Sequence, residues 1–215
     1  NLGVLFFFKY GKFFLENLNN ILSILNLTHN FILPDFILPV GISFYTFQTL
    51  SYTIDVYRGK TQPTNFLDFT LFVSFFPQLV AGPIIRAKDF LPQLFKRTFL
   101  TLKRVNLGAF LIISGLFKKI VIADSIAPMI NNIFNSPEIF SSTDHVLAIL
   151  GFSIQIYCDF SGYSDIAIGL ALWMGFRIRK NFNFPYLAKS LTEFWKRWHI
   201  SLSTWIRDYV YIPLG

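Results

Sequence analysis

The chain is poor in charge and nearly devoid of cysteine. Charged residues make up 14% of its 215 residues, whereas a soluble globular chain carries about a quarter. A single cysteine, Cys158, excludes an internal disulfide framework and a metal site built from a cysteine cluster. The sequence also has no GxSxG nucleophile elbow, Walker phosphate loop or zinc-binding motif. We therefore expect no metal centre and none of the active sites that those motifs build.

Apolar residues take the place of the missing charge. They form 53% of the chain, with 27 phenylalanines, and gather in blocks that approach the roughly 20 residues of a bilayer crossing. No internal repeat or linker separates them, so we predict one all-α membrane domain over residues 1–215, a polytopic helical bundle. A large soluble protein with an aromatic core is the alternative. The blocks span residues 2–15, 31–57, 66–85, 105–123 and 145–176.

The net charge of +7 has a pattern that argues against nucleic-acid binding, because the basic residues lie between the apolar blocks. Residues 86–104 contain six Lys or Arg and one acid, and residues 177–197 again contain six Lys or Arg. Residues 124–144 contain three acids and no Lys or Arg. Cytoplasmic loops are enriched in positive charge, so block 105–123 is predicted to leave the cytoplasm and block 145–176 to return.

Both ends of the chain are expected to be internal to a longer protein. Asn1 is not an initiator methionine, and residues 2–8 are apolar without the basic region or cleavage site of a signal peptide. Residues 211–215 follow a strongly patterned segment directly. We therefore expect truncation at both termini.

Block 66–85 does not resemble an ordinary spanning helix. Basic residues flank it on both sides, and its second half, FPQLVAGP at residues 76–83, contains two prolines and a glycine. Proline removes a helix hydrogen bond, and broken backbone at membrane depth persists only inside protein or beside water. We predict a re-entrant segment, with a kinked spanning helix as the alternative.

Block 145–176 is interrupted by the polar sequence CDFSGYSD at residues 158–165. A carboxylate near the bilayer centre costs about 2.5–3.5 kcal/mol on insertion scales, and such groups usually face a protein interior or a wet cavity. One hypothesis is that Asp159, Ser161, Tyr163 and Asp165 line or brace a polar tunnel. The alternative is a helix-breaking loop near the interface, where water solvates both acids. Neither hypothesis assigns direct catalysis to an aspartate.

A second polar motif lies at residues 190–208. Ser190 and Glu193 have the spacing of a capping box, and Glu193 precedes Arg197 by four residues, the favourable order for an ion pair. These signals predict a helix from Ser190 to about Tyr211, ending before Pro213. Its tryptophans and adjacent basic residues also suit a helix lying in the headgroup layer. One face of it would carry Trp195, His199, Leu202, Ser203 and Ile206.

His199 is the candidate general base on that face. An imidazole with an ordinary pKa near 6.5 suits proton transfer at neutral pH. Spacing alone nevertheless favours a hydrogen-bonded structural histidine. His29 and His145 lie in polar stretches between the apolar blocks, and we expect both to be solvated.

Taken in order, these segments resemble the membrane-bound O-acyltransferase family. The resemblance extends from about residue 40 to the end, and is closest to the bacterial branch that contains the alginate O-acetyltransferase membrane subunit and the D-alanyl transfer protein of teichoic acids. It rests on FPQLVAGP (76–83) with Arg86 and FLPQL (90–94), YCDFSGYSD (157–165), NFNFPY (181–186), EFWKRWHISLSTW (193–205) and RDYVYIPLG (207–215).

The resemblance implies a multi-helix bundle around a tunnel, with re-entrant and interfacial helices, in a bacterial inner membrane. It implies an enzyme that moves an acyl group, expected to be acetyl, from a cytoplasmic thioester to hydroxyls of an envelope polysaccharide such as alginate. Acyl-CoA or an acyl carrier protein would be the donor substrate, with no bound cofactor, and a periplasmic or surface partner would complete the transfer. D-alanyl transfer to teichoic acid is the alternative within the family.

His199 matches the first histidine of the family, so the resemblance implies a catalytic role for it. The second family histidine occurs in a Leu-Trp-His-Gly context beyond residue 215, which implies that this chain alone is inactive. Arg86, Lys88 and Arg177 would favour an anionic donor, although membrane topology alone also explains their charge. Tunnel or structural support is implied for Asp159, Ser161, Tyr163, Asp165, Trp195, Arg197, Ser203 and Asp208. Rival hypotheses are a polysaccharide exporter and a non-catalytic scaffold.

Overall fold

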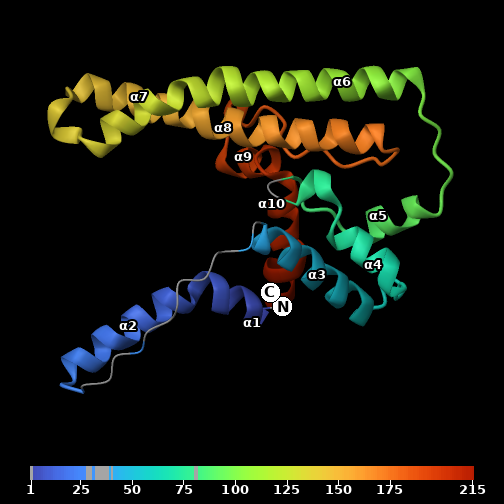
Figure 1. The fold of residues 1–215 in the computed structure, drawn as a ribbon, viewed down its shortest axis with the longest axis horizontal. Helices are drawn as coiled ribbons and strands as arrows, with labels where there is room; N and C mark the ends of the chain where they lie inside the picture. Colours follow the sequence, from blue (N-terminus) through green and yellow to red (C-terminus); the bar gives the residue numbers. More distant parts are fainter. Residues whose placement is uncertain (1, 28–30, 32–38, 40, 80–81) are drawn as a thin grey trace.

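The computed structural model describes residues 2–27, 31, 39, 41–79 and 82–215. Within these residues every regular element is helical, so the predicted all-α fold is confirmed. Figure 1 shows a long helical hairpin with shorter helices gathered on one side of it, and an N-terminal helix that extends away from them. His29, Val80 and Ala81 lie outside the described residues.

The elements follow one another closely along the chain. In order they are α1 (Leu2–Leu5), η1 (Phe6–Tyr10), α2 (Gly11–Ile24), α3 (Ile42–Tyr57), α4 (Phe66–Val73), η2 (Phe76–Gln78), α5 (Ala87–Leu94), α6 (Leu102–Leu116), η3 (Phe117–Ala123), α7 (Asp124–Asn135), η4 (Pro137–Ile139), α8 (Ser142–Trp173), η5 (Pro185–Leu187), α9 (Leu191–Arg197), α10 (Ile200–Ile206), η6 (Arg207–Tyr211) and α11 (Ile212–Leu214). The η elements are short stretches of 3₁₀ or π helix.

The hairpin consists of two helices long and apolar enough to cross a bilayer. One runs from Leu102 to Asn135 through α6, η3 and α7, and the other is α8. At about 1.5 Å per residue their 34 and 32 residues exceed the roughly 30 Å of a hydrocarbon core. The first helix therefore extends 12 residues beyond the apolar block predicted to end at residue 123.

The polar sequence at residues 158–165 does not break α8, which is continuous from Ser142 to Trp173. The alternative of a helix-breaking loop is therefore wrong. Gly162 lies within this stretch, and its neighbour across the hairpin is Gly115 of α6. A small residue is needed there because the two backbones touch.

Two glycine pairs bring α6 and α8 together along one seam. A Cβ atom on Gly115 would lie 2.5 Å from the carbonyl oxygen of Gly162, and one on Gly169 would lie 2.6 Å from that of Gly108. Contacts this short are not tolerated by real Cβ atoms, so each position of the seam requires glycine. Small residues that allow close backbone approach are the usual basis of helix packing in membranes.

A second body of short helices contains the aromatic core. Phe72 and Phe75 pack against Phe90 of α5, and Phe75 and Phe90 pack against Phe176, which follows α8 in the chain. Helix α4 ends at Val73, and the chain turns before η2. Counted through η2, the apolar helix Phe66–Gln78 is still shorter than the roughly 20 residues of a bilayer crossing, which argues against a kinked spanning helix. Re-entry into the membrane stays a prediction.

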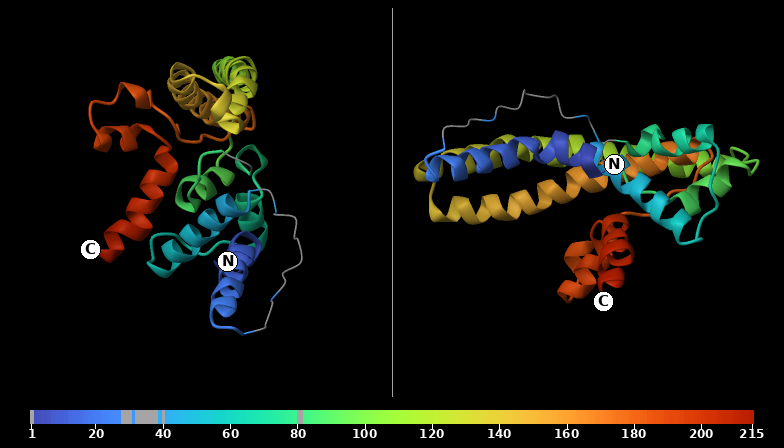
Figure 2. Two further views of the ribbon diagram at one scale, coloured as in Figure 1. Left: turned by 90° about the vertical axis from the view of Figure 1, so that its left-hand side faces the viewer. Right: turned by 90° about the horizontal axis from the view of Figure 1, so that it is seen from below.

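The C-terminal segment departs from the single helix that was predicted. Helix α9 ends at Arg197, and α10 begins at Ile200 after a turn at Trp198 and His199. Beyond α10 the helix continues through η6 and α11 past Pro213, so its predicted end is also wrong. Figure 2 shows this segment, drawn in red, standing out from the side of the hairpin. The break changes which residues share a face.

Candidate active site

His199 occupies the turn between α9 and α10 and has a left-handed backbone, with φ of 40° and ψ of 55°. This region is rarely occupied by residues other than glycine, and non-glycine residues that adopt it concentrate at functional sites. The side chain is 9% exposed. The turn places the imidazole against α8, where its ring lies 4.6 Å from that of Phe160.

Asn181 fixes this turn through hydrogen bonds to the two residues that follow His199. Its backbone carbonyl accepts a hydrogen bond from Ile200 N (2.8 Å), and its side-chain Oδ1 accepts from Ser201 N and Oγ. Its Nδ2 donates to Ser164 Oγ of α8 at 3.2 Å. Asn183 N donates to the Arg197 carbonyl on the other side of His199. Segment 181–183 therefore fixes the chain before and after the histidine.

Aromatic rings close the space around the turn. Phe182 stacks near His199 with ring centroids 6.3 Å apart, and it meets Phe160 and Trp198 edge to face. Tyr157 of α8 contacts Phe182 and Trp198 in turn. The imidazole is thus enclosed mainly by apolar ring surface.

This environment sets the charge of the histidine. Burial lowers the pKa of His199 to about 4, because removal from water disfavours the charged imidazolium. The imidazole is therefore neutral at pH 7. Its Nε2 atom is buried and has no hydrogen-bond partner among the described residues. A buried polar atom without a partner is rare, which singles out this nitrogen as a candidate hydrogen-bonding group of the site.

The polar stretch of α8 lies beside the same turn, and its two aspartates pair across the hairpin. Asp165 contacts Lys118 Nζ at 2.6 Å, and Asp159 contacts Lys119 Nζ at 2.6 Å. Both lysines belong to η3, where π-helical geometry interrupts the long helix. π-bulges occur frequently at functional sites. Ser161 Oγ is buried without a described partner, and Tyr163 is partly buried.

A cavity of about 200 Å³ lies beside α10. It brings together the three basic residues Arg86, Lys88 and Arg177, and Ile200 and Ser201 of α10 line it too. Ile84 N, on the same wall, donates to Ser201 Oγ at 3.0 Å. The cavity therefore adjoins the residues that directly follow His199.

Asp208 lies on the cavity wall and, through Arg86, adjoins the contact between Tyr209 and Asp55 of α3. Its carboxylate accepts from Arg86 Nη1 and from Arg207 Nε, both at 2.7 Å. Partial burial alone would raise the pKa of Asp208, but hydrogen bonds from Arg207 and Arg86 outweigh it and lower that pKa. The guanidinium of Arg86 also lies over the Tyr209 ring, whose hydroxyl donates to the buried Asp55 carboxylate at 2.7 Å.

The remaining predicted residues have different surroundings. Arg197 pairs with Glu193, as predicted, and Ser190 caps α9 through its side chain. Ser203 donates from its backbone to the His199 carbonyl and from Oγ to that of Trp198, so it supports the turn. Trp195 is exposed and packs on Phe194. It does not share a helical face with His199, because the break at residues 198–199 separates them.

Sequence reasoning missed the supporting residues. Asn181 and Ser164 are almost fully buried and hydrogen-bonded to each other, and Asp55 is buried beneath Tyr209. Asp55 is the only carboxylate in the apolar segment ISFYTFQTLSYTIDVY. Such groups are usually paired, so this isolation could have predicted a buried partner for it. The only signal for Asn181 was its place in the NFNFPY motif.

Comparison with known proteins identifies the family. The model of the membrane-bound O-acyltransferase family matches residues 53–215. The chain belongs to this family. It is 49% identical over its whole length to a probable alginate O-acetylase, AlgI, of Pseudomonas aeruginosa. It is 39% identical, again over its whole length, to a peptidoglycan O-acetyltransferase of Helicobacter pylori. Over 80% of its length it is 32% identical to a teichoic acid D-alanyltransferase of Bacillus subtilis.

The chain spans less than half the length of these relatives. It covers 41% of the Pseudomonas protein and 45% of each of the other two. The activities in the names of these relatives are therefore those of proteins more than twice as long as the part that the chain matches.

Proposed function

We propose that the full-length protein is an O-acyltransferase that moves an acetyl group from a cytoplasmic thioester to hydroxyls of an envelope polysaccharide of the alginate type. The observation that carries the proposal is His199, a buried neutral imidazole whose Nε2 lacks a described partner, in a left-handed turn beside a basic cavity. Family membership and the acetylases among the relatives support it.

The chemistry requires a base and a site for the leaving thiol. The acceptor hydroxyl oxygen forms a bond to the thioester carbonyl carbon, and its proton passes to His199 Nε2. The carbon–sulfur bond then breaks, and the thiolate takes up the proton to leave as a thiol. Because burial lowers its pKa to about 4, His199 is unprotonated at pH 7, and the same burial makes it a weaker base than a solvated imidazole. General base catalysis of this kind contributes about 10²–10⁴-fold.

The rest of the machinery is proposed to lie in the remainder of the protein. The family resemblance implies a second histidine beyond residue 215 and a periplasmic or surface partner that passes the acetyl group to the polysaccharide. The protein would occupy the bacterial inner membrane, crossing it several times. Donor and acceptor alignment would contribute much of the remaining rate enhancement.

Acetyl is favoured over D-alanyl by the pattern of similarity. The alginate O-acetylases of P. aeruginosa and Azotobacter vinelandii are 49% and 48% identical to the chain, and the peptidoglycan O-acetyltransferase is 39% identical. The D-alanyltransferases are 30–32% identical. D-alanyl transfer to teichoic acid remains the second candidate within the same reaction class.

The test is His199→Ala in the full-length gene, with O-acetyl groups measured per sugar residue of the envelope polysaccharide. His145→Ala is the matched control, because His145 lies at the start of α8 and contacts only the local Ser141 carbonyl in the described structure. We expect loss of acetylation for His199→Ala and no change for His145→Ala, at equal membrane protein levels by blot.

Other outcomes separate the rivals. Normal acetylation in His199→Ala, together with its loss in a deletion strain, would identify a scaffold. Less exported polysaccharide with an unchanged acetyl content per sugar would identify an exporter. D-alanyl esters in place of acetyl esters would support the second candidate.

A further inference from the structure

An apolar groove lies between the two helices of the hairpin, at the end where α6 begins and α8 ends (Figure 1). Leu107 and Leu111 of α6 line one side of it, and Ile168 and Leu172 of α8 line the other. Residues four apart lie on one face of a helix, so both sides run along their helices. The groove has a volume of about 640 Å³. Its lining and direction suit an extended hydrocarbon chain.

Basic side chains gather at the mouth of this groove. Arg97, Lys103 and Arg104 line it, and the segment 95–104 that carries them contains four Lys or Arg and no acid. Arg97 and Lys103 are exposed. Arg104 donates to the Gly175 carbonyl, a neutral acceptor, at 3.2 Å. All three positive charges therefore lack an acidic partner among the described residues, and like charges gathered in one place favour an anionic ligand.

The mouth lies at the level expected for lipid headgroups. Arg104 belongs to the first turn of a helix long and apolar enough to cross a bilayer, and Leu111 lies about 10 Å further along its axis at 1.5 Å per residue. Trp173 ends α8 and donates its indole N–H to the Val105 carbonyl at 3.0 Å. Tryptophan is enriched at membrane–water interfaces. Phe99, on the basic segment, is 78% exposed, and exposed apolar side chains beside cations are typical of segments that bind anionic membrane surfaces.

We propose that this groove binds one anionic phospholipid, of the phosphatidylglycerol type. The lipid phosphate contacts Arg97, Lys103 and Arg104, and one acyl chain lies between α6 and α8. A phosphatidylcholine headgroup has no net charge to offset the three cations, and a water-soluble anion leaves the apolar groove unfilled. Clusters of Lys and Arg next to the end of a membrane-spanning helix are a recurrent basis of anionic lipid binding. The inference stands apart from the proposed acyl transfer.

The test measures lipid binding to the purified full-length protein in detergent. Native mass spectrometry gives the fraction of protein that retains a phospholipid across a titration with phosphatidylglycerol or phosphatidylcholine. The charge variant is Arg97→Gln with Lys103→Gln. The groove variant is Leu107→Trp, which narrows the groove and keeps every charge. All three positions are exposed, so the fold does not depend on the side chains that are changed.

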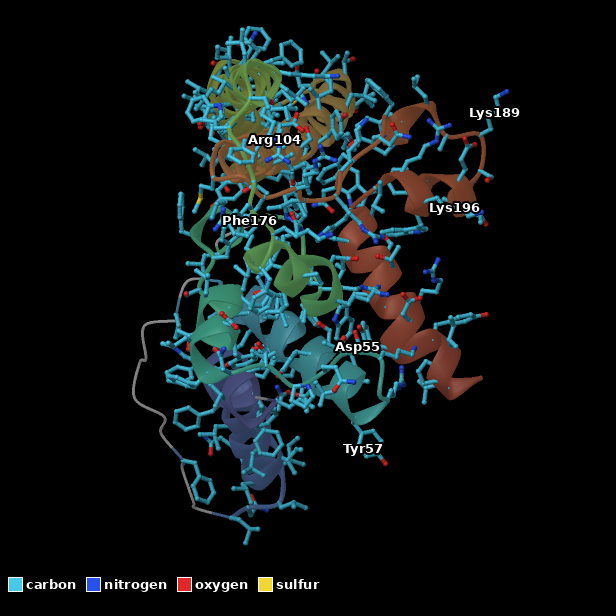
Figure 3. All side chains as sticks on the ribbon, turned by 90° about the vertical axis from the view of Figure 1, so that its right-hand side faces the viewer. Asp55, Tyr57, Arg104, Phe176, Lys189 and Lys196 are labelled. Carbon is cyan, nitrogen blue, oxygen red and sulfur yellow. The ribbon has the colours of Figure 1, made fainter. Side chains whose placement is uncertain are left out.

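Two controls separate this site from general surface charge and from a simple anion site. Lys189→Gln with Lys196→Gln also removes two exposed positive charges. Figure 3 shows these two lysines on the segment around α9 and Arg104 on the hairpin. Glycerol 3-phosphate, a headgroup without acyl chains, is the soluble competitor.

We expect wild type to bind phosphatidylglycerol about 10-fold more tightly than phosphatidylcholine, because the cations at the mouth attract a charged headgroup. The charge variant should bind the two lipids within about twofold of each other. The groove variant should bind both lipids more weakly and keep the preference for phosphatidylglycerol. The lysine control should match wild type, and glycerol 3-phosphate should not displace phosphatidylglycerol.

Three results would overturn the proposal. The first is equal phosphatidylglycerol binding by wild type and both variants, as expected if the rest of the full-length protein covers the groove. The second is an equal loss of lipid preference in the lysine control, since general surface charge would then explain it. The third is displacement by glycerol 3-phosphate at the same concentration as the lipid, since the groove would then contribute nothing.

Discussion

His199 holds a backbone conformation that costs an L-residue roughly 1–2 kcal/mol. The chain accepts this cost because hydrogen bonds fix it on both sides, from Asn183 N to the Arg197 carbonyl and from Ile200 N to the Asn181 carbonyl. Ser203 N then donates to the carbonyl of His199 itself. The strained turn is therefore maintained by residues that do not reach the imidazole.

Asn181→Ala tests this arrangement. The variant loses the side-chain bonds to Ser201 and Ser164, so the turn should loosen and water should reach His199. We expect its pKa to rise from about 4 towards the ordinary 6.5. Protonated imidazole, which cannot accept a proton, then accumulates as pH falls below that value. The activity of the variant relative to wild type should therefore decrease between pH 7.5 and 5.5.

Acetylation measured across this pH range checks the prediction, with Asn183→Ala as control. The Asn183 side chain bonds only the exposed Lys180 among described residues, and its backbone bond survives the change. A constant ratio of variant to wild-type activity at all pH values, even at reduced activity, would contradict the positioning role of Asn181.

At the scale of elements, the sequence predicted long helices better than it predicted their breaks. Residues 158–165 of helix α8 contain a glycine, two serines and two acids, which locally suggest a loop. It stays helical because Gly162 and Gly169 meet α6 and because Lys118 and Lys119 pair with the acids. These partners lie 40 or more residues away in the chain, so local pattern could not reveal them.

The prediction of one continuous helix through His199 was wrong in the opposite direction, because a helix was expected where the structure has a break. Residues 190–211 have capping and periodicity that suit one continuous helix, and the pairing of Glu193 with Arg197 is present as predicted. The interruption comes from Asn181 and Asn183, which bond the backbone on either side of the histidine. Tertiary contacts overrode local propensity here.

Gly162→Ala tests the glycine seam. A methyl group at this position would lie 2.7 Å from the Gly115 carbonyl oxygen, so the helices must separate, at a typical cost of about 1–3 kcal/mol. Gly151→Ala is the control in the same helix, because its methyl would meet only the movable end of Ile130 at 3.1 Å. We expect a lower melting temperature in detergent for Gly162→Ala and little change or a small gain for Gly151→Ala. Equal melting temperatures would show that the seam tolerates side chains.

On the scale of the whole molecule, the hairpin separates two chemically different ends. Figure 1 places the turn between α7 and α8 at the end away from α5. The turn is acidic, with Glu138 and Asp144 nearby, whereas the opposite end carries the basic residues around α5. The predicted orientation puts the basic end in the cytoplasm.

Cysteine labelling tests this orientation in spheroplasts, which lack the outer membrane but keep the inner membrane sealed. The full-length protein would carry Cys158→Ser together with either Glu138→Cys or Lys96→Cys, both at exposed positions. An impermeant maleimide should label the first variant in intact spheroplasts and the second only after permeabilisation. Labelling of Lys96→Cys in intact spheroplasts would reverse the orientation.

The ion pairs across the hairpin also bear on how the protein is made. A lysine or aspartate alone near the bilayer centre costs about 2.5–3.5 kcal/mol, and Lys118 and Lys119 emerge from the ribosome some 40 residues before their partners Asp165 and Asp159. Insertion of helix 102–135 into lipid on its own would therefore carry the free-energy cost of two unpaired lysines. A turn of only six residues, 136–141, joins it to α8. Biosynthesis is expected to retain the first helix in the insertion machinery until α8 arrives, so that both are delivered to the bilayer as one neutralised pair.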